Sequence, residues 1–219
     1  MKKAIVVFII CVLAIGTSCK EEVVQINKNV FFPVKMGEMW GLVDTSCNFT
    51  LEPVYNCFGE FYQSIALVSK GDRIAYIDEN GKLLKPFDFI SGTHFSEGLA
   101  FVLGTDSAIS CIDTAMNIVF ALPAVERAEI FEDGLAAVKV GDKFGYIDRS
   151  GKNVIPCTFD VVTPFSEGYA AVANFVSIKD SLILKWNYID KKGKVVIENK
   201  FDDALPFHMG KAAVRNENS

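Results

Sequence analysis

The sequence predicts an all-β protein, built as an open curved array of about five three-stranded repeats. Two observations carry this prediction. Three short segments recur in register about every 35 residues, which is the signature of a repeat architecture. After residue 19, apolar residues alternate or form short runs and show no 3.6-residue helical period. A closed ring resembling a β-propeller is the alternative arrangement.

The first eighteen residues have the order of an export signal. Lys2 and Lys3 precede an uncharged apolar run over residues 4–16, which is shorter than the ~20 residues needed to span a bilayer. We therefore predict a cleaved signal peptide over residues 1–18. Small residues then lead into Cys19. This pattern resembles a bacterial lipoprotein signal, and the resemblance implies acylation of Cys19 and attachment to the membrane through an N-terminal lipid.

Three charged residues follow the cysteine, in the order Lys20-Glu21-Glu22. They are similar to the export signal of some surface lipoproteins, and they also fit a simple solvated tether. We predict a lipidated tether over residues 19–29 and a repeat domain over residues 30–219. The expected location is the cell envelope, as an outer-membrane lipoprotein that is either exposed at the cell surface or faces the periplasm.

The first repeated segment begins with an aromatic residue, usually followed by an acid, a glycine and an alternating strand. A small alanine recurs inside the strand, which indicates close approach of a neighbouring layer. The copies cover residues 61–68, 95–102, 131–138, 165–172 and 207–214. A counterpart of this strand at residues 30–35 already starts the first repeat, so the last copy is surplus. We expect it to cap an open end, which favours the open array.

The second repeated segment ends each time in an aspartate. Its copies cover residues 40–44, 74–78, 109–113, 144–148 and 186–190. A third segment is an apolar run that leads to an aromatic residue and a polar neighbour, as in residues 83–88, 154–160 and 195–202. Three such segments in each unit predict three strands.

This pattern resembles the WG-repeat family of bacterial β-rich repeat proteins, named for a Trp-Gly pair that survives here at Trp40-Gly41. The resemblance extends over residues 30–215. It implies no shared catalytic residues and a role in binding.

Each repeat aspartate is expected to begin a tight turn. Three copies continue as Asp-x-x-Gly-Lys, which is the residue preference of a type I turn. In the other two copies Cys47 and Met116 replace the glycine, and Asn48 and Asn117 follow. Because asparagine tolerates a positive φ, we predict a turn one residue longer in these two repeats.

Four residues are candidates for ligand binding. Trp40 and Trp186 fit either a stacking platform or core positions between repeats, and the core interpretation is favoured. An insertion at residues 173–185 predicts a long hairpin that carries Phe175 and Ile178. This hairpin is interpreted as a flap over the final sheet edge or as a recognition finger, since insertions in repeat proteins often lie on the binding face.

Several classes of chemistry are not indicated. An isoelectric point near 5.1 and the absence of a basic cluster argue against nucleic acid. No catalytic motif, cofactor fingerprint or metal-ligand spacing is present, and the two histidines, His94 and His208, look like variants at junctions between repeats. The cysteines have no disulfide pattern, and buried free thiols are expected at Cys57, Cys111 and Cys157.

These observations predict a non-enzymatic envelope protein whose repeat array binds a protein or a glycan, with no cofactor. A structural or assembly accessory of the outer membrane is the alternative. A hydrolase acting on envelope or external glycans is a third hypothesis, which a cluster of three or more acids beside an exposed aromatic residue would favour.

Overall fold

The computed structural model describes residues 31–178 and 181–216. The predicted signal peptide and tether, including Cys19, lie outside these residues. The described chain is entirely β, with strands joined by turns and short loops, and this confirms the predicted fold class. None of its segments forms a helix that is long and apolar enough to cross a membrane.

The strands form six small antiparallel sheets in chain order. The first two have three strands each: β1 (Phe31–Met36), β2 (Met39–Asp44) and β3 (Phe49–Tyr55), then β4 (Cys57–Tyr62), β5 (Ile65–Lys70) and β6 (Arg73–Asp78). The third has β7 (Ser91–Gly92), β8 (Leu99–Leu103), β9 (Ile109–Asp113) and β10 (Ile118–Leu122). The fourth has β11 (Arg127–Glu132), β12 (Leu135–Val140), β13 (Lys143–Asp148) and β14 (Asn153–Phe159). The fifth has β15 (Val161–Val162), β16 (Tyr169–Ile178), β17 (Ser181–Asp190) and β18 (Val195–Phe201), and the last pairs β19 (Asp203–Ala204) with β20 (Val214–Arg215).

The number of strands in the central sheets differs from the expectation. Three of the six sheets have four strands, where three were predicted. The additional strand comes first in each sheet, and in two cases, β7 and β15, it is only two residues long. A two-residue strand is too short for an alternating pattern to mark it in the sequence.

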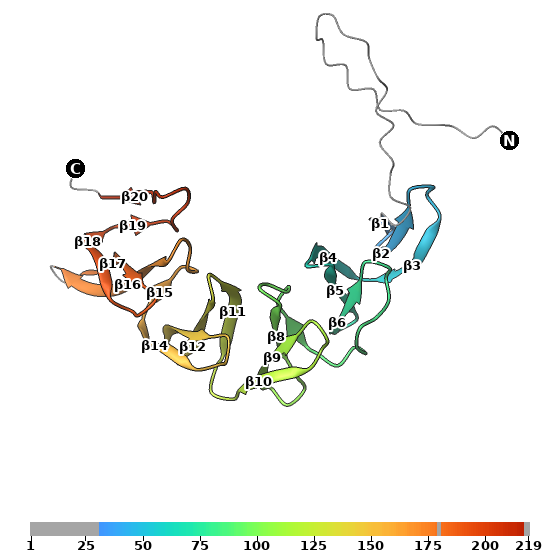
Figure 1. Ribbon diagram of the computed structural model, residues 1–219, viewed down its shortest axis with the longest axis horizontal. Helices are drawn as coiled ribbons and strands as arrows, with labels where there is room; N and C mark the ends of the chain where they lie inside the picture. Colours follow the sequence, from blue (N-terminus) through green and yellow to red (C-terminus); the bar gives the residue numbers. More distant parts are fainter. Residues whose placement is uncertain (1–30, 179–180, 217–219) are drawn as a thin grey trace, which may run out of the picture.

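The sheets follow one another along an open arc, and the two ends of the described chain lie far apart (Figure 1). The strands β4, β11 and β15 lie toward the inside of this arc, while β3, β10, β14 and β18 lie toward the outside (Figure 1). Compared with the four-stranded sheets, the first sheet lacks the first strand among the described residues. The last sheet contains only the counterparts of the first two strands. The open arrangement is therefore the one observed.

The hydrophobic core is divided into five clusters, most of them between successive sheets. In one of them Tyr76 of β6 packs edge-on against Phe95, at 5.2 Å between ring centroids. The recurring alanines of the first segment are almost fully buried at Ala66, Ala100, Ala136 and Ala170. Larger side chains at these positions would push the sheets apart, because interiors are close-packed.

Each sheet has two distinct ends. The repeat aspartates and the turn between the first two strands lie together at one end, which we call the aspartate end. In the fourth sheet, for example, Leu135 pairs with Glu132 on one side and with Asp148 on the other. The turn between the second and third strands lies at the other end, here called the hairpin end. In the fifth sheet β16 and β17 continue past this level, and their pairing extends to Ile178 and Ser181.

Candidate functional site

The repeat aspartates form the predicted tight turns. In all five copies Oδ1 accepts the backbone N–H groups two and four residues later, at 2.8–3.0 Å, as for Asp148 with Ser150 and Lys152. These bonds occupy the carboxylates with main-chain donors, as expected for turn chemistry.

The prediction of longer turns at Cys47 and Met116 is wrong. Both residues occupy the glycine position itself, with φ values of 60° and 66°, and the turns keep the length of the other three. The asparagines serve a different purpose, since Nδ2 of Asn48 and of Asn117 donates to Oδ2 of the turn aspartate at 3.1 Å. The backbone N–H and then the side chain of each asparagine lower the pKa of Asp44 and Asp113.

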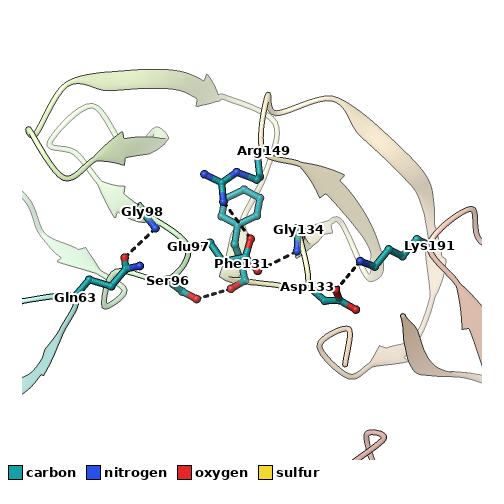
Figure 2. Close-up of polar contacts among 9 residues, drawn as sticks. All are labelled: Gln63, Ser96, Glu97, Gly98, Phe131, Asp133, Gly134, Arg149 and Lys191. Atoms are coloured by element: carbon teal, nitrogen blue, oxygen red, sulfur yellow. Dashed lines mark hydrogen bonds and ion pairs between the residues drawn. The ribbon is translucent and has the colours of Figure 1, made fainter. Parts of the chain in front are cut away.

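At the aspartate end, a second set of turns links each sheet to the next, from the second sheet to the last. The turn between the first two strands holds a non-glycine residue at positive φ, and its side chain accepts a hydrogen bond from the following sheet. Figure 2 shows Oε1 of Gln63 accepting from the Gly98 N–H at 2.8 Å, and Oε1 of Glu97 accepting from the Gly134 N–H at 3.0 Å. Asp133 and Glu167 repeat the contact with the N–H groups of Gly168 and Gly210. We call this series the turn ladder.

The charges in the turn ladder match from sheet to sheet. Oε2 of Glu97 pairs with Nη1 of Arg149 at 3.2 Å, and Oδ1 of Asp133 pairs with Nζ of Lys191 at 2.6 Å (Figure 2). Arg149 and Lys191 each come directly after a repeat aspartate. In the third sheet the residue after the repeat aspartate is the neutral Thr114, and the ladder residue that contacts the third sheet is the neutral Gln63. These acids therefore hold neighbouring sheets in register.

Three cavities meet at Arg127, on the inner strand β11. The first, of about 210 Å³, lies between the third and fourth sheets. The other two, of about 560 Å³ and 390 Å³, lie on the side of the fifth sheet, and Phe144 lines both. We call these three cavities together the β11 groove. The cavity of 560 Å³ is its hairpin pocket, lined by Glu126, Arg127, Lys139, Asp142, Phe144, Asp160 and Phe175.

Ion pairs fix the charged walls of the β11 groove. Nε of Arg127, whose side chain is 66% exposed, pairs with Oε1 of Glu129 at 2.6 Å. Nζ of Lys143 pairs with Oδ1 of Asp160 at 2.7 Å. This ammonium group and then the N–H of Phe175 lower the pKa of Asp160, so the carboxylate stays charged at neutral pH.

Asp160 also holds the base of the long hairpin. Its Oδ2 accepts the N–H of Phe175 at 3.0 Å, and its own N–H donates to Oδ1 of Asn174 at 3.1 Å. Phe175 is 53% exposed and Leu182 is 73% exposed. The hairpin therefore projects from the hairpin end and exposes apolar side chains, which is the geometry of a finger rather than of a flap over the final edge.

The four predicted binding residues have different surroundings. Trp186 is only 8% exposed and belongs to the core between the last two sheets. Trp40 is half-buried against the core between the first two sheets, and β2 and β17 lie at opposite ends of the arc (Figure 1). The two tryptophans therefore do not share a platform. Phe175 lines the hairpin pocket, and the side chain of Ile178 lies outside the described residues.

Sequence reasoning missed the residues that form most of the β11 groove. Arg127, Glu126 and Glu129 belong to the first strand of a sheet, and none of the three repeated segments predicted that strand. Phe144 carried a signal, since it takes the place of the repeat tryptophan. No motif marked the others, because neighbouring sheets bring them together only in space.

His94 lies against an aromatic side chain at the aspartate end. Its ring stacks on Tyr62 at 3.9 Å between centroids, and the Tyr62 hydroxyl donates to Oε2 of Glu60 at 3.2 Å. Burial raises the pKa of the neighbouring Glu132, and His94 acts in the opposite direction. His94 thus bridges two sheets, which agrees with a position at a junction between repeats.

The four cysteines in the described part of the chain are free thiols, but not all of them are buried. Burial raises the pKa of Cys111 to about 12, and Cys157 is partly buried. Cys57 is exposed, so the expectation that it is buried is wrong. It starts β4, an inner edge strand with no strand on its other side. Within residues 31–178 and 181–216, no three His, Cys, Asp or Glu side chains lie close enough together to hold a metal ion.

The geometry is that of a β-repeat array with a polar groove on the inside of the arc. A family model described as "WG containing repeat" matches residues 40–73, 75–103, 110–144, 144–174 and 186–218. The chain belongs to this family. No curated protein matches the sequence closely enough to count as a relative.

Several solved structures resemble the chain. One, described as a eukaryotic initiation factor, is 14% identical with a TM-score of 0.52, over 85% of this chain and 57% of that one. The chain thus spans less than two thirds of that structure. The WD40 β-propeller domain of Doa1 is 12% identical (TM-score 0.38, 86% of this chain and 71% of that one). BamB from Moraxella catarrhalis is 11% identical (TM-score 0.37, 74% and 55%).

Proposed function

We propose that the chain is a non-catalytic binding module, held at the cell envelope by a lipid on Cys19, and that its partner is a protein or a glycan that occupies the β11 groove. One observation carries the binding role: three cavities converge on Arg127, on the inner side of a rigid array. Sites that bind ligands are typically concave and combine apolar surface with a few oriented polar groups. Membership of the WG-repeat family supports a binding role in general terms.

The anchoring part of the proposal rests on the sequence before residue 31. A basic start, an apolar run and small residues lead into Cys19, and several acyl chains together give stable attachment. Mass spectrometry of the mature N-terminus tests it. The expected result is a diacylated or triacylated cysteine at position 19, and an unmodified Cys19 would remove the anchor from the account.

Protease treatment of intact cells then locates the module, with a periplasmic protein as the control. Cleavage of this protein while the control survives places the module at the cell surface. Cleavage only after the outer membrane is opened places it in the periplasm, which is the second arm of the location proposal. Cleavage in neither case, in a protein shown to be protease-sensitive when purified, contradicts an envelope location outside the inner membrane.

Quantitative co-purification from detergent-solubilised envelopes tests the binding part. The double variant Arg127→Glu/Phe175→Ala alters the groove at two exposed side chains and should lose the partner. Phe32→Ala is the matched control, because Phe32 is 51% exposed on β1, at the other end of the arc. A set of bound components that is the same for all three proteins would show that the groove is not the binding site.

A further inference from the structure

The hairpin pocket has an unusual lining for its size. Five of its seven residues are charged and the other two are phenylalanines, with no aliphatic side chain among them. Its volume of about 560 Å³ lies within the ~300–1,000 Å³ of ligand sites. An acyl chain or an apolar small molecule would take water from these charged side chains without replacing the hydrogen bonds that the water makes. The pocket therefore suits a polar ligand.

The lining has three acids, Glu126, Asp142 and Asp160, and two cations, Arg127 and Lys139, so its net charge is −1. Three acids beside an exposed phenylalanine are the combination that the hydrolase hypothesis names, but Asp160 is held by Lys143 and by the N–H of Phe175. Arg127 is likewise paired, with Glu129. A phosphate or another anion needs cations that are free to bind it, and a lining with a net negative charge disfavours an anion. Glu126 and Asp142 can accept hydrogen bonds from hydroxyl groups, and Arg127 and Lys139 can donate to hydroxyl oxygens. The lining therefore suits an uncharged ligand that is rich in hydroxyl groups.

The aromatic rings add a second requirement. Phe175 is half-exposed, and the bond from its N–H to Asp160 fixes its backbone beside the charged residues. A phenyl ring has no polar atom, so it offers only its faces and edges to a ligand. The ligand must therefore carry an apolar C–H face as well as many hydrogen-bonding groups. A sugar ring has this combination, with C–H groups on its faces and hydroxyls around its edge.

A protein partner fits this pocket less well. The centre of a protein interface is depleted of charged residues and enriched in aromatic and other apolar ones. Here the charged residues surround the pocket and the two phenylalanines are the minority. The composition is the reverse of an interface centre.

We infer that the hairpin pocket binds a neutral oligosaccharide, which specifies the ligand of the proposed function and rests on it. The sugar places a C–H face on Phe175. Arg127 and Lys139 donate to its hydroxyl oxygens, and the carboxylates of Glu126 and Asp142 accept from its hydroxyl groups. Asp160 is a positioning residue, because it holds Phe175 in place.

Titration calorimetry with the full chain in detergent tests this inference. The probes are the neutral hexasaccharides cellohexaose, maltohexaose, laminarihexaose and chitohexaose, and a heparin-derived hexasaccharide is the anionic comparison. At least one neutral probe should bind, with an affinity that is the same at low and high salt, since only charged ligands are screened. Phe175→Ala should weaken binding by about tenfold or more, which corresponds to about 1.4 kcal/mol.

Two further variants distinguish the effect of losing the aromatic ring from the effect of disturbing the fold. Phe175→Trp restores an aromatic face and should retain binding, whereas Phe32→Ala should leave the affinity unchanged. Binding of none of the neutral probes, preference for the heparin fragment, or full binding by Phe175→Ala would overturn the inference. If the co-purification experiment still shows a protein partner lost by the groove variant, the proposed function survives and only the ligand class is wrong.

Discussion

At the residue scale, a turn that lacks its glycine is supported by a neighbouring side chain. Cys47 and Met116 hold a left-handed backbone conformation, which costs an ordinary residue about 1–2 kcal/mol. Asn48 and Asn117 strengthen these turns through a second bond to the aspartate. The turn length is thus preserved in all five copies, and with it the position of the strand that follows.

Cys47→Gly should stabilise the protein. Cys47 is exposed, so glycine removes the backbone strain without loss of a buried side chain, and we expect a gain of roughly 0.5–1 kcal/mol in the free energy of unfolding. Urea denaturation measures it. Met116→Gly is the informative control, because Met116 is only 7% exposed and packs in a core cluster, so the same change should destabilise there. A lower denaturation midpoint for Cys47→Gly would argue against strain at this turn.

The repeat aspartates also predict sensitivity to acid. Hydrogen bonds from the turns favour the charged carboxylates, so the pKa values of Asp44, Asp113 and Asp148 lie below the ordinary value of 3.8. The stabilisation is therefore complete above about pH 5 and is lost progressively as the pH falls through the lowered values. Urea midpoints should fall between pH 5 and pH 2, and Asp113→Asn should reduce that dependence, whereas Asp72→Asn, at an exposed site, should not. Identical pH profiles for all three proteins would contradict this.

At the element scale, the turn ladder couples each sheet to the next. Glu97 accepts from the main chain of the fourth sheet with one oxygen and from Arg149 with the other. Tyrosine hydroxyls add links of the same kind, as Tyr146 donates to the carbonyl oxygen of Thr163 at 2.7 Å. These contacts fix the relative position of successive sheets. They therefore also determine the shape of the β11 groove between the sheets.

Two substitutions at Glu97 separate the two contacts. Glu97→Gln keeps an acceptor for the Gly134 N–H and loses only a half-exposed ion pair, so we expect a loss of about 0–1 kcal/mol. Glu97→Ala leaves the N–H without its partner, for which we expect a loss of about 1–2 kcal/mol. Chemical denaturation of both variants checks the order. Equal losses would mean that the main-chain contact contributes nothing.

The sequence predicted the elements that repeat and missed those that do not. Aspartates, alanines and glycines recur at fixed spacing, because every sheet needs the same turn and the same close approach. Three residues of the turn ladder, Glu97, Asp133 and Glu167, recur as an acid before glycine, but the repeat pattern did not predict that their side chains contact the next sheet. The β11 groove was hidden too, because Arg127 and Phe175 come from neighbouring sheets and meet only after the array has curved.

At the scale of the whole molecule, the open arc has an accessible inner side. First strands such as β11 and β15 line that side (Figure 1), and Phe175, at the base of the longest hairpin, lines a pocket there. Because successive sheets contact mainly their neighbours, a substitution in one groove wall should leave distant sheets folded. Substitutions in the β11 groove should therefore leave the rest of the array folded, so the role of the groove can be tested directly.

Photo-crosslinking in living cells tests the central claim, that the β11 groove is the binding site. A photoreactive phenylalanine analogue is placed at position 175 in the hairpin pocket, and separately at position 32 on the first strand. The account predicts a specific crosslinked product from position 175, abolished when Arg127→Glu is added, and none from position 32. The same products from both positions, or a product from position 175 that Arg127→Glu leaves unchanged, would contradict it.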